Sequence, residues 1–234
     1  MKLGIMQPYF FPYFQQFRHI AQCDQWIVFD TVHYSRKTWI NRNRILDRKK
    51  GWSYISVPII KGATRDSIAN ATLGTGSWRE DILDHLRIYQ NEAPSFDMVH
   101  SLVGEILFTP ARTVGDLNTN ILRRICSCLG IGTPIMRLSE MELDLPPMAE
   151  AGHWALLISQ ALGASEYSNA PGGRALFDPE LYQRSGVQLE FYQPIELRYS
   201  TGTFPFVPDL SVIDTLMWLS PIKLKGLLQP ETTI

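Results

Sequence analysis

Apolar residues at the start of the chain form two short buried runs separated by a helical pattern. Residues 2–7 (KLGIMQ) predict a first strand, and residues 26–30 (WIVFD) predict a second. Between them, apolar residues recur at three-residue steps, which predicts a helix over 12–23. Strand, helix and strand in this order form a βαβ unit, which is typical of a parallel sheet.

A basic segment with loosely alternating polar and apolar positions follows. Residues 33–50 contain seven Lys or Arg residues and one Asp. The alternation over 38–46, and the apolar run WSYISVPII after it, predict a β-ribbon over 33–60 with its turn at 49–51.

The rest of the chain alternates helical patterns with short strands. The patterns predict helices over 78–89, 99–106, 114–128, 149–162 and 209–220, and strands over 134–139, 165–169 and 186–194. We therefore expect an α/β fold with a Rossmann-like, largely parallel sheet flanked by helices. We expect a single domain over 1–234, into which the 33–60 ribbon and a helical segment over 78–129 are inserted.

Composition narrows the functional classes. The 234 residues are 45% hydrophobic and 19% charged, which is an ordinary globular composition. A net charge of -1 argues against a nucleic-acid partner. The sequence has no apolar run of about 18 residues and no secretory pattern, so we expect no membrane span. Three Cys without a C-x-x-C pair argue against disulfides and favour the cytoplasm.

Polar and aromatic side chains follow the first predicted strand. Gln7 and Tyr9 lie where the carboxyl end of a parallel strand borders a ligand crevice. The next helix begins there, and its N-terminus suits an anion. The aromatic residues of this segment could stack a base or sugar ring, or belong to the core. His19, on the predicted helix, is expected to be a partly exposed helix residue.

Asp30 and His33 are the catalytic candidates. Asp30 ends the second strand, and His33 lies three residues on. A carboxylate at the carboxyl end of a strand can bind a ribose hydroxyl, orient a His or hold a metal. The two residues could form a base and its orienting partner. The alternative is that Asp30 only caps a turn.

The basic ribbon predicts recognition of phosphate. Arg42 and Arg44 share one face of the ribbon, and Asn41 and Asn43 share the other. Arg binds phosphate or carboxylate in a bidentate manner, and Asn43 could bind a sugar hydroxyl or a carbonyl. This favours a phosphate-bearing small substrate, such as a nucleotide-linked sugar or a coenzyme A thioester. An edge ribbon protected by charge is the alternative.

A glycine-rich turn adds further binding candidates. Tyr167 lies in the strand before it, and Gly172 and Gly173 allow backbone N–H groups to approach a ligand closely. The segment matches no P-loop or G-x-G-x-x-G motif, so it indicates no nucleotide class. A plain turn is the alternative.

The last predicted helix begins among three polar candidates. Asp209 and Ser211 could cap this helix, or Asp209 and Asp214 could face the site. The five His residues are scattered, and no spacing predicts a metal site.

Segments spread over nearly the whole chain form one recognisable pattern. In order they are Met6–Tyr13, Asp24, Phe29–Asp30, Trp39–Asn43, Tyr89, Ala93–Phe96, Asp116–Asn118, Leu129–Ile131, Tyr167–Gly173 and Phe206–Asp214. This pattern resembles the WbqC-like protein family. The chain departs from the family at Gln15–Gln16, where Gly-Tyr is usual, and at His33, where Gln is frequent.

The resemblance implies a place in bacterial pathways for surface polysaccharides, such as O-antigen, and for amino-sugar decoration. We therefore expect a transferase that acylates the amine of a nucleotide-linked sugar, with an acyl thioester as co-substrate. Arg42 and Arg44 would hold phosphate, and Asp30 or His33 would accept the amine proton. Asn43 or N–H groups of the glycine-rich turn would stabilise the oxyanion.

Two other functions stay open. A non-catalytic partner of a pathway enzyme would expose a large apolar patch. An ATP-using nucleotidyltransferase or ligase would need magnesium, with Asp30, Asp209 and Asp214 as ligands. An enzyme should keep Asp30, Arg42 and Asn43 around one pocket, whereas a scaffold need not. A homo-oligomer is compatible with each function.

Overall fold

Five parallel strands form the central sheet of the computed structural model, which describes residues 1–62, 65–145 and 151–229. The strands lie in the order β5-β2-β1-β6-β7, and neighbouring strands are parallel. Their bounds are Lys2–Met6 (β1), Gln25–Val28 (β2), Ile135–Arg137 (β5), Glu166–Asn169 (β6) and Gln188–Phe191 (β7). Helices flank the sheet, which confirms the predicted α/β, Rossmann-like class.

The strand order creates a switch point between β1 and β6. From β1 the chain moves outward through β2 to β5, and then returns to β6 and β7 on the other side. β1 pairs with β6 from Lys2 opposite Glu166 to Gly4 opposite Ser168. The segments that follow the two strands therefore leave the sheet side by side, which is where open α/β sheets bind ligands.

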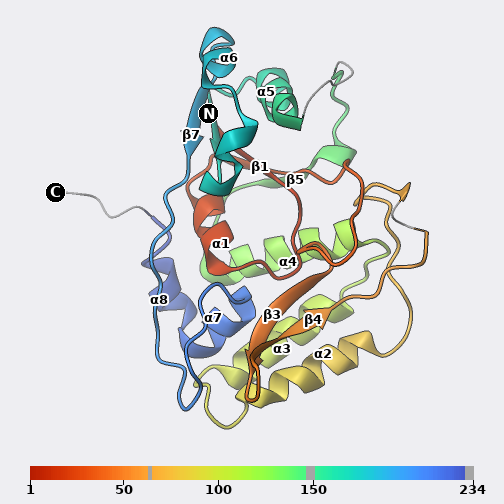
Figure 1. Cartoon of the computed structure of the whole chain (residues 1–234), viewed down its shortest axis with the longest axis vertical. Helices are drawn as coiled ribbons and strands as arrows, with labels where there is room; N and C mark the ends of the chain where they lie inside the picture. Colours follow the sequence, from red (N-terminus) through yellow and green to blue (C-terminus); the bar gives the residue numbers. More distant parts are fainter. Residues whose placement is uncertain (63–64, 146–150, 230–234) are drawn as a thin grey trace, which may run out of the picture.

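Helices cover both faces of the sheet (Figure 1). They are α1 (Phe14–Ala21) and α4 (Val114–Leu129) on one face, and α5 (Ala151–Ala161) and α6 (Pro179–Arg184) on the other. Side chains alternate across a strand, so Trp26 of β2 packs with α1 and α4, and the neighbouring Ile27 packs with α5 and α6.

The predicted ribbon is a hairpin that is shorter than 33–60. β3 (Arg42–Asp47) and β4 (Gly51–Ser56) pair antiparallel. The turn lies where the sequence predicts it, because the Asp47 carboxylate accepts two backbone N–H groups of the turn, at 2.9 and 2.8 Å. Residues 33–41 form turns outside the hairpin, with an isolated bridge at His33.

The predicted helices after the hairpin are present. They are α2 (Trp78–Leu86) with a 3₁₀ turn (Arg87–Tyr89), α3 (Phe96–Phe108), α4, α5 and, after the sheet, α7 (Val212–Trp218). The start of the helix predicted over 149–162 lies outside the described residues. The elements that the sequence did not predict are short: α6, α8 (Pro221–Lys225) and 3₁₀ turns over Leu138–Glu140 and Pro171–Leu176.

The inserted elements share one hydrophobic cluster with the α1 face of the sheet. Ile45 and Ile55 of the hairpin, Val103 of α3 and Leu216 of α7 all belong to it. This common core fixes the hairpin against the segment that follows β1.

Among the helices that the structure describes, none combines the length and apolar character needed to cross a membrane.

Candidate functional site

A crevice of about 590 Å³ opens at the switch point of the sheet. Gln7 and Tyr9 reach it from the segment after β1, and Asn169 and the glycine-rich turn reach it from the end of β6. Gln16 of α1 completes one wall. The volume falls within the usual range of ligand sites, about 300–1,000 Å³.

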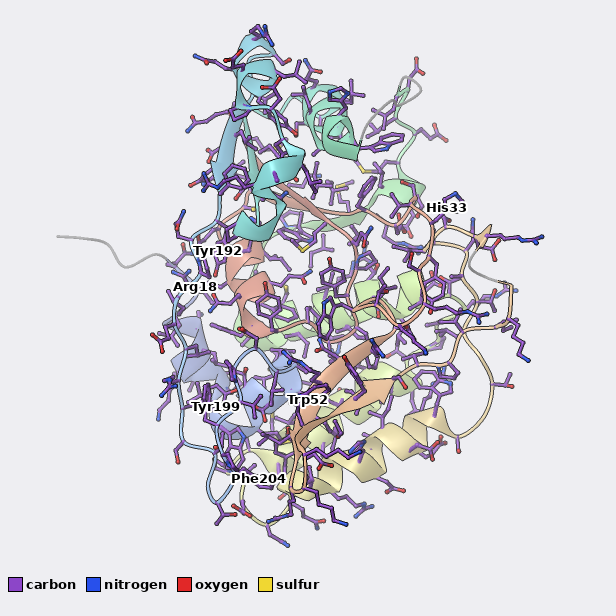
Figure 2. All side chains as sticks on the ribbon, in the orientation of Figure 1. Arg18, His33, Trp52, Tyr192, Tyr199 and Phe204 are labelled. Atoms are coloured by element: carbon purple, nitrogen blue, oxygen red, sulfur yellow. The ribbon has the colours of Figure 1, made fainter. Side chains whose placement is uncertain are left out.

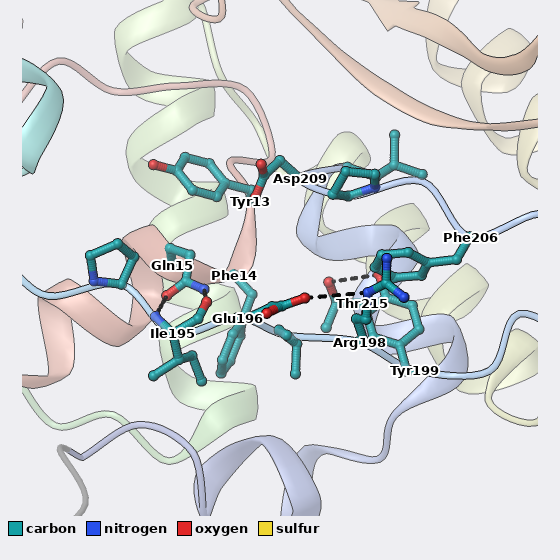
Figure 3. A pocket seen from close by; sticks show the side chains of 14 residues that line it. Tyr13, Phe14, Gln15, Ile195, Glu196, Arg198, Tyr199, Phe206, Asp209 and Thr215 are labelled. Atoms are coloured by element: carbon teal, nitrogen blue, oxygen red, sulfur yellow. Dashed lines mark hydrogen bonds and ion pairs between the residues drawn. The ribbon is translucent and has the colours of Figure 1, made fainter.

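Two smaller cavities adjoin the crevice and share lining residues with it. The first, of about 190 Å³, shares Tyr9, Tyr13 and Trp39 with the crevice. The second, of about 480 Å³, shares Tyr13 and Gln15 with it, and Figure 3 shows it from close by. Asp209 lines both smaller cavities, so Tyr13 and Asp209 stand at the junction of one composite site.

The segment that follows β1 is held in a strained conformation by the hairpin and α7. Phe11 has a φ of 40°, which is unusual for a bulky residue. The Asn43 side chain donates to the carbonyls of Phe10 and Phe11, at 3.1 and 2.8 Å. Ser211 Oγ also donates to the Phe11 carbonyl, at 2.8 Å. Asn43 and Ser211 are therefore positioning residues of the crevice.

A second buried amide fixes the same segment from the other side. The Asn118 side chain, on α4, donates to the carbonyls of Pro8 and Ile40, both at 2.8 Å. The Phe10 N–H donates to the Trp39 carbonyl, at 2.8 Å. These bonds join the segment after β1 to the segment before β3, so Tyr9 and Trp39 line the crevice together.

Gln16 carries a polar group that lacks a protein partner. Its side chain is 3% exposed, and neither its amide nitrogen nor its oxygen forms a hydrogen bond within the described part of the chain. The neighbouring Gln15 is fully engaged with Tyr192 and Ile195. Because an unpaired buried amide costs stability, its position on the crevice wall indicates a group that pairs with a ligand.

His19 is buried, contrary to the prediction of a partly exposed residue. β6 and the segment after β7 cover it: Nε2 lies 2.9 Å from Ser168 Oγ, and the ring stacks on Tyr192 at 4.8 Å. Burial lowers the pKa of His19 to about 4, so the imidazole is neutral at pH 7. It therefore lines the crevice as a neutral hydrogen-bonding group and is a weak base.

Arg44 lines the small cavity that adjoins the crevice. Its guanidinium lies over the rings of Trp39 and Trp52, at 5.6 and 5.2 Å, and Nη2 donates to the Asp209 carbonyl at 3.1 Å. Its Nε is buried without a partner among the described residues. This cation therefore retains an unused donor beside Tyr9, which suits a phosphate or carboxylate.

Asp209 is held in the left-handed region, with a φ of 54°. The figure places it beside Tyr13, at the edge of the cavity opposite Glu196 and Arg198 (Figure 3). Burial, and secondly the negative charge of Asp209, raise the pKa of Tyr13. The phenol of Tyr13 stays protonated at neutral pH, while the Asp209 carboxylate is its nearest acidic neighbour at the junction.

Asp30 and His33 do not form the predicted pair. Asp30 is fully buried, and its carboxylate accepts from Arg137 Nε at 2.7 Å and from the Ser139 hydroxyl and N–H at 2.7 and 3.0 Å. Arg137 also binds Asp116 at 2.7 Å. Figure 2 shows His33 across the molecule from Tyr192, which lines the crevice. The geometry gives Asp30 a structural ion pair between β2, β5 and α4.

Arg42 and Asn41 lie away from the crevice. The Arg42 guanidinium stacks on Tyr54 of β4 at 4.0 Å, and Asn41 lines a different cavity. Of the three residues expected around one enzyme pocket, only Asn43 therefore reaches the composite site, and neither Asp30 nor Arg42 lines any of its three cavities.

Asp214 is a buried carboxyl beneath the site. The hydroxyl groups of Tyr89 and Tyr199 donate to it, at 2.8 and 2.6 Å. Tyr199 lines the cavity shown in Figure 3, whereas Asp214 is buried and does not line it. Burial raises the pKa of Asp214 to about 6. Ser211 caps α7 through the Ile213 N–H.

The composite site gathers a large part of the predicted set. The crevice brings together Gln7, Tyr9, Tyr167, Gly172 and Gly173. The small cavity adds Asn43, Arg44 and Asp209. Asp30, His33, Asn41, Arg42, Ser211 and Asp214 lie outside the three cavities. The sequence analysis missed Gln16 as a binding group, although Gln15–Gln16 stood out as a departure from the family pattern.

In the described ranges of the chain, no group of three or more His, Cys, Asp or Glu side chains is arranged to hold a metal ion. The Asp30 carboxylate accepts from Arg137, and the Asp214 carboxylate accepts from Tyr199. Asp209 lines the small cavity, which neither Asp30 nor Asp214 lines.

A model of the WbqC-like protein family matches residues 7–225. The chain belongs to this family. It is similar to the uncharacterized protein Rv1507c of Mycobacterium tuberculosis, with 27% identity over 218 residues, which are 92% of each chain. No solved structure matches the chain. The predicted family resemblance is confirmed. The segments that carry it include Asn43, Asn118 and Ser211, whose side chains bind backbone carbonyls of the segment after β1.

The raised pKa of Asp214 predicts a pH-dependent stability. A carboxyl whose pKa rises from 3.8 to about 6 on folding contributes stability below pH 4 that is lost as the pH rises through 6. We expect the stability advantage of wild type over Asp214→Asn to fall by about 2 kcal/mol between pH 4 and pH 7. Urea unfolding at both pH values measures this difference.

The exposed Ser101→Ala variant on α3 removes no titratable group and is the control, so its difference from wild type should stay constant. If the advantage of wild type over Asp214→Asn instead grows with pH, the carboxyl is ionised more easily in the folded state, and the burial argument fails.

Proposed function

We propose that the protein is a transferase of bacterial surface-polysaccharide or amino-sugar biosynthesis that binds a nucleotide-linked sugar in the switch-point crevice and acylates its amine. The observation that carries this proposal is the unpaired, buried amide of Gln16 on the wall of a crevice at the carboxyl ends of β1 and β6. A cavity at this place with convergent polar groups is the expected form of a small-molecule site.

The crevice suits a ligand with planar rings and many hydroxyl groups. Tyr9, Trp39 and Trp154 line it from three different segments, and aromatic faces stack nucleobases and sugar rings. Gln7 and Asn169 add donors and acceptors without charge. The described residues that line the crevice include no Lys or Arg, so the charged part of the ligand belongs elsewhere.

Arg44 provides the place for that charge. It lines the adjoining cavity with Tyr9 and Trp39, which also line the crevice. A nucleotide-linked sugar that stacks in the crevice would therefore direct its phosphates toward this guanidinium, where the unpaired Nε and the remaining N–H groups can donate.

Gln16 supplies recognition of an amide-like edge. A carboxamide presents one acceptor and one donor group side by side, so its complement is a ligand group with the same pair reversed. The base edge of a pyrimidine nucleotide has that arrangement. Gln16 therefore favours ligands that carry such an edge over ligands that carry only hydroxyl groups.

In this proposal Asp209 replaces Asp30 and His33 as proton acceptor. The Asp30 carboxylate is paired with Arg137, and His33 does not line the crevice. His19 has a lowered pKa and is a weak base. Asp209 stands at the junction of the cavities, where a carboxylate can also attract the protonated form of an amine.

The proposed acyl transfer needs a proton acceptor and a donor group that stabilises the oxyanion. The amine nitrogen bonds to the acyl carbon of a thioester, the carbon–sulfur bond breaks, and the amine proton passes to Asp209 and then to the leaving thiolate. Both hydrogens of the Asn43 amide are used by Phe10 and Phe11. Asn43 thus cannot stabilise the oxyanion, which leaves the Gly172 N–H at the crevice for that role.

Gln16→Leu tests the binding site. Removing an unpaired buried amide should raise the free energy of unfolding of the ligand-free protein by about 1 kcal/mol. It should also weaken binding of a nucleotide-linked amino sugar about tenfold, since a ligand hydrogen bond is lost. Isothermal titration and urea unfolding measure the two effects, with Gln160→Leu on the exposed side of α5 as the control.

Destabilisation by Gln16→Leu together with unchanged binding would assign the amide a structural role and contradict the proposal. A non-catalytic partner protein would give no binding in either variant or in wild type.

Asp209→Asn tests the chemistry. Asn adopts the left-handed conformation easily and has the size of Asp, so the fold and ligand affinity should be kept. Acylation, measured as thiol release, should fall at least about 100-fold when the general base is lost. Glu196→Gln, at the opposite edge of the same cavity, should retain activity. Full activity of Asp209→Asn would remove Asp209 from the mechanism.

A further inference from the structure

We propose that a second site, separate from the crevice, binds a nucleotide carrying several phosphates. It is a cavity of about 650 Å³ between β4 and α2, referred to below as the basic cavity, and it shares no lining residue with the crevice or its two adjoining cavities. The proposal does not rest on the proposed function, because the basic cavity can bind such a ligand whether or not the crevice binds a sugar.

Charge is the first observation that supports this site. Arg36, Lys37 and Lys61 line the basic cavity, and among the residues that the structure describes Asp81 is the one carboxylate that lines it. Within the described ranges, none of these cations forms an ion pair. Asp81 accepts a hydrogen bond from the Ser77 hydroxyl at 3.2 Å. The protein as a whole has a net charge of -1, so the positive charge of this cavity is a local excess.

The cavity wall also contains a polar atom without a partner. The Asn41 side-chain nitrogen donates to the Val57 carbonyl at 3.3 Å, which fixes the amide in place. Its oxygen is buried and accepts no hydrogen bond from the described residues. A ligand that enters the basic cavity can donate an N–H or O–H to this oxygen and relieve that cost.

Backbone strain coincides with the charged wall. Lys37 has a φ of 57°, in the left-handed region that a Lys rarely occupies. Such strain costs of order 1–3 kcal/mol and occurs most often at ligand-binding turns, where it places a side chain. The turn over 33–41, which is not part of the hairpin, thus brings Arg36 and Lys37 to the cavity that Lys61 lines from the far side of β4.

Tyr54 offers a stacking surface at the same cavity. Its ring is 38% exposed, and Arg42 covers it from one side at 4.0 Å. A partly exposed ring stacked with a guanidinium suits a nucleobase. Together with three unpaired cations, it selects a ligand that combines a base with two or more phosphates, rather than a simple anion.

A continuous row of rings and guanidinium groups connects this site with the crevice. Tyr54 contacts Trp52 at 5.1 Å, Arg44 lies over Trp52 at 5.2 Å, and Arg44 also lies over Trp39 at 5.6 Å. Trp39 lines the crevice. A nucleotide bound in the basic cavity could thus extend an arm along the hairpin toward the crevice, as coenzyme A does beyond its phosphates. ATP has the same base and phosphates without the arm.

The test compares two variants that each remove two positive charges. Arg36→Gln/Lys61→Gln removes cations of the basic cavity, and Lys49→Gln/Lys50→Gln removes two exposed cations at the hairpin turn. Isothermal titration with coenzyme A and with ATP measures the dissociation constants. We expect the cavity variant to bind at least one of them about tenfold or more weakly than wild type, and the turn variant to bind normally.

Each outcome decides the proposal. A selective loss in the cavity variant supports it, and the tighter of the two ligands then identifies the source of the nucleotide. Equal losses in both variants would show an unspecific charge effect and overturn it. Absence of binding at 1 mM ligand would also overturn it. So would weaker binding by Gln16→Leu together with normal binding by both double variants. Because Arg36 and Lys61 are exposed, both variants should keep the melting temperature of wild type.

Discussion

Asn43 donates both hydrogens of its side-chain amide to two successive carbonyl groups, those of Phe10 and Phe11. These bonds hold a backbone that would otherwise relax, since Phe11 has a positive φ. Ser211 binds the same carbonyl from α7. Through this one carbonyl, elements far apart in sequence set the course of the chain after β1, and with it the shape of the crevice, the position of Tyr9 and the access to Arg44.

This constraint explains why many of the polar residues that stand out in the sequence act on the protein rather than on a ligand. Asn43, Asn118 and Ser211 bind backbone carbonyls, and Asp30 binds Arg137 at the ends of two strands. The groups that form these bonds are buried and paired, as is usual for buried polar groups. The groups left for a ligand are the unpaired ones: Gln16 on the crevice wall, Arg44 Nε in the adjoining cavity and the Asn41 oxygen in the basic cavity.

Periodicity predicted the fold because its signals are local. The βαβ start and the helix ending at Gly130 follow from apolar spacing and from a left-handed cap, which the structure shows at φ 69°. The alternation of the ribbon likewise put Asn43 on the face opposite Arg42 and Arg44, but it could not show that the Phe10 and Phe11 carbonyls lie there. The surroundings of Gln16 and His19 are formed by β6 and by the chain after β7, about 150 residues away. No local pattern could therefore distinguish these two residues from ordinary helix residues.

Hydrogen exchange on Asn43→Leu, with and without a nucleotide-linked sugar, tests the central claim most directly. The variant keeps the side-chain volume and removes both bonds to the carbonyls. We expect residues 7–13 to lose protection while β1 and β2 keep theirs, and ligand affinity to fall with the loss of protection. Unchanged protection of residues 7–13 would show that the crevice does not depend on the two Asn43 hydrogen bonds. Full ligand affinity despite reduced protection would show the same.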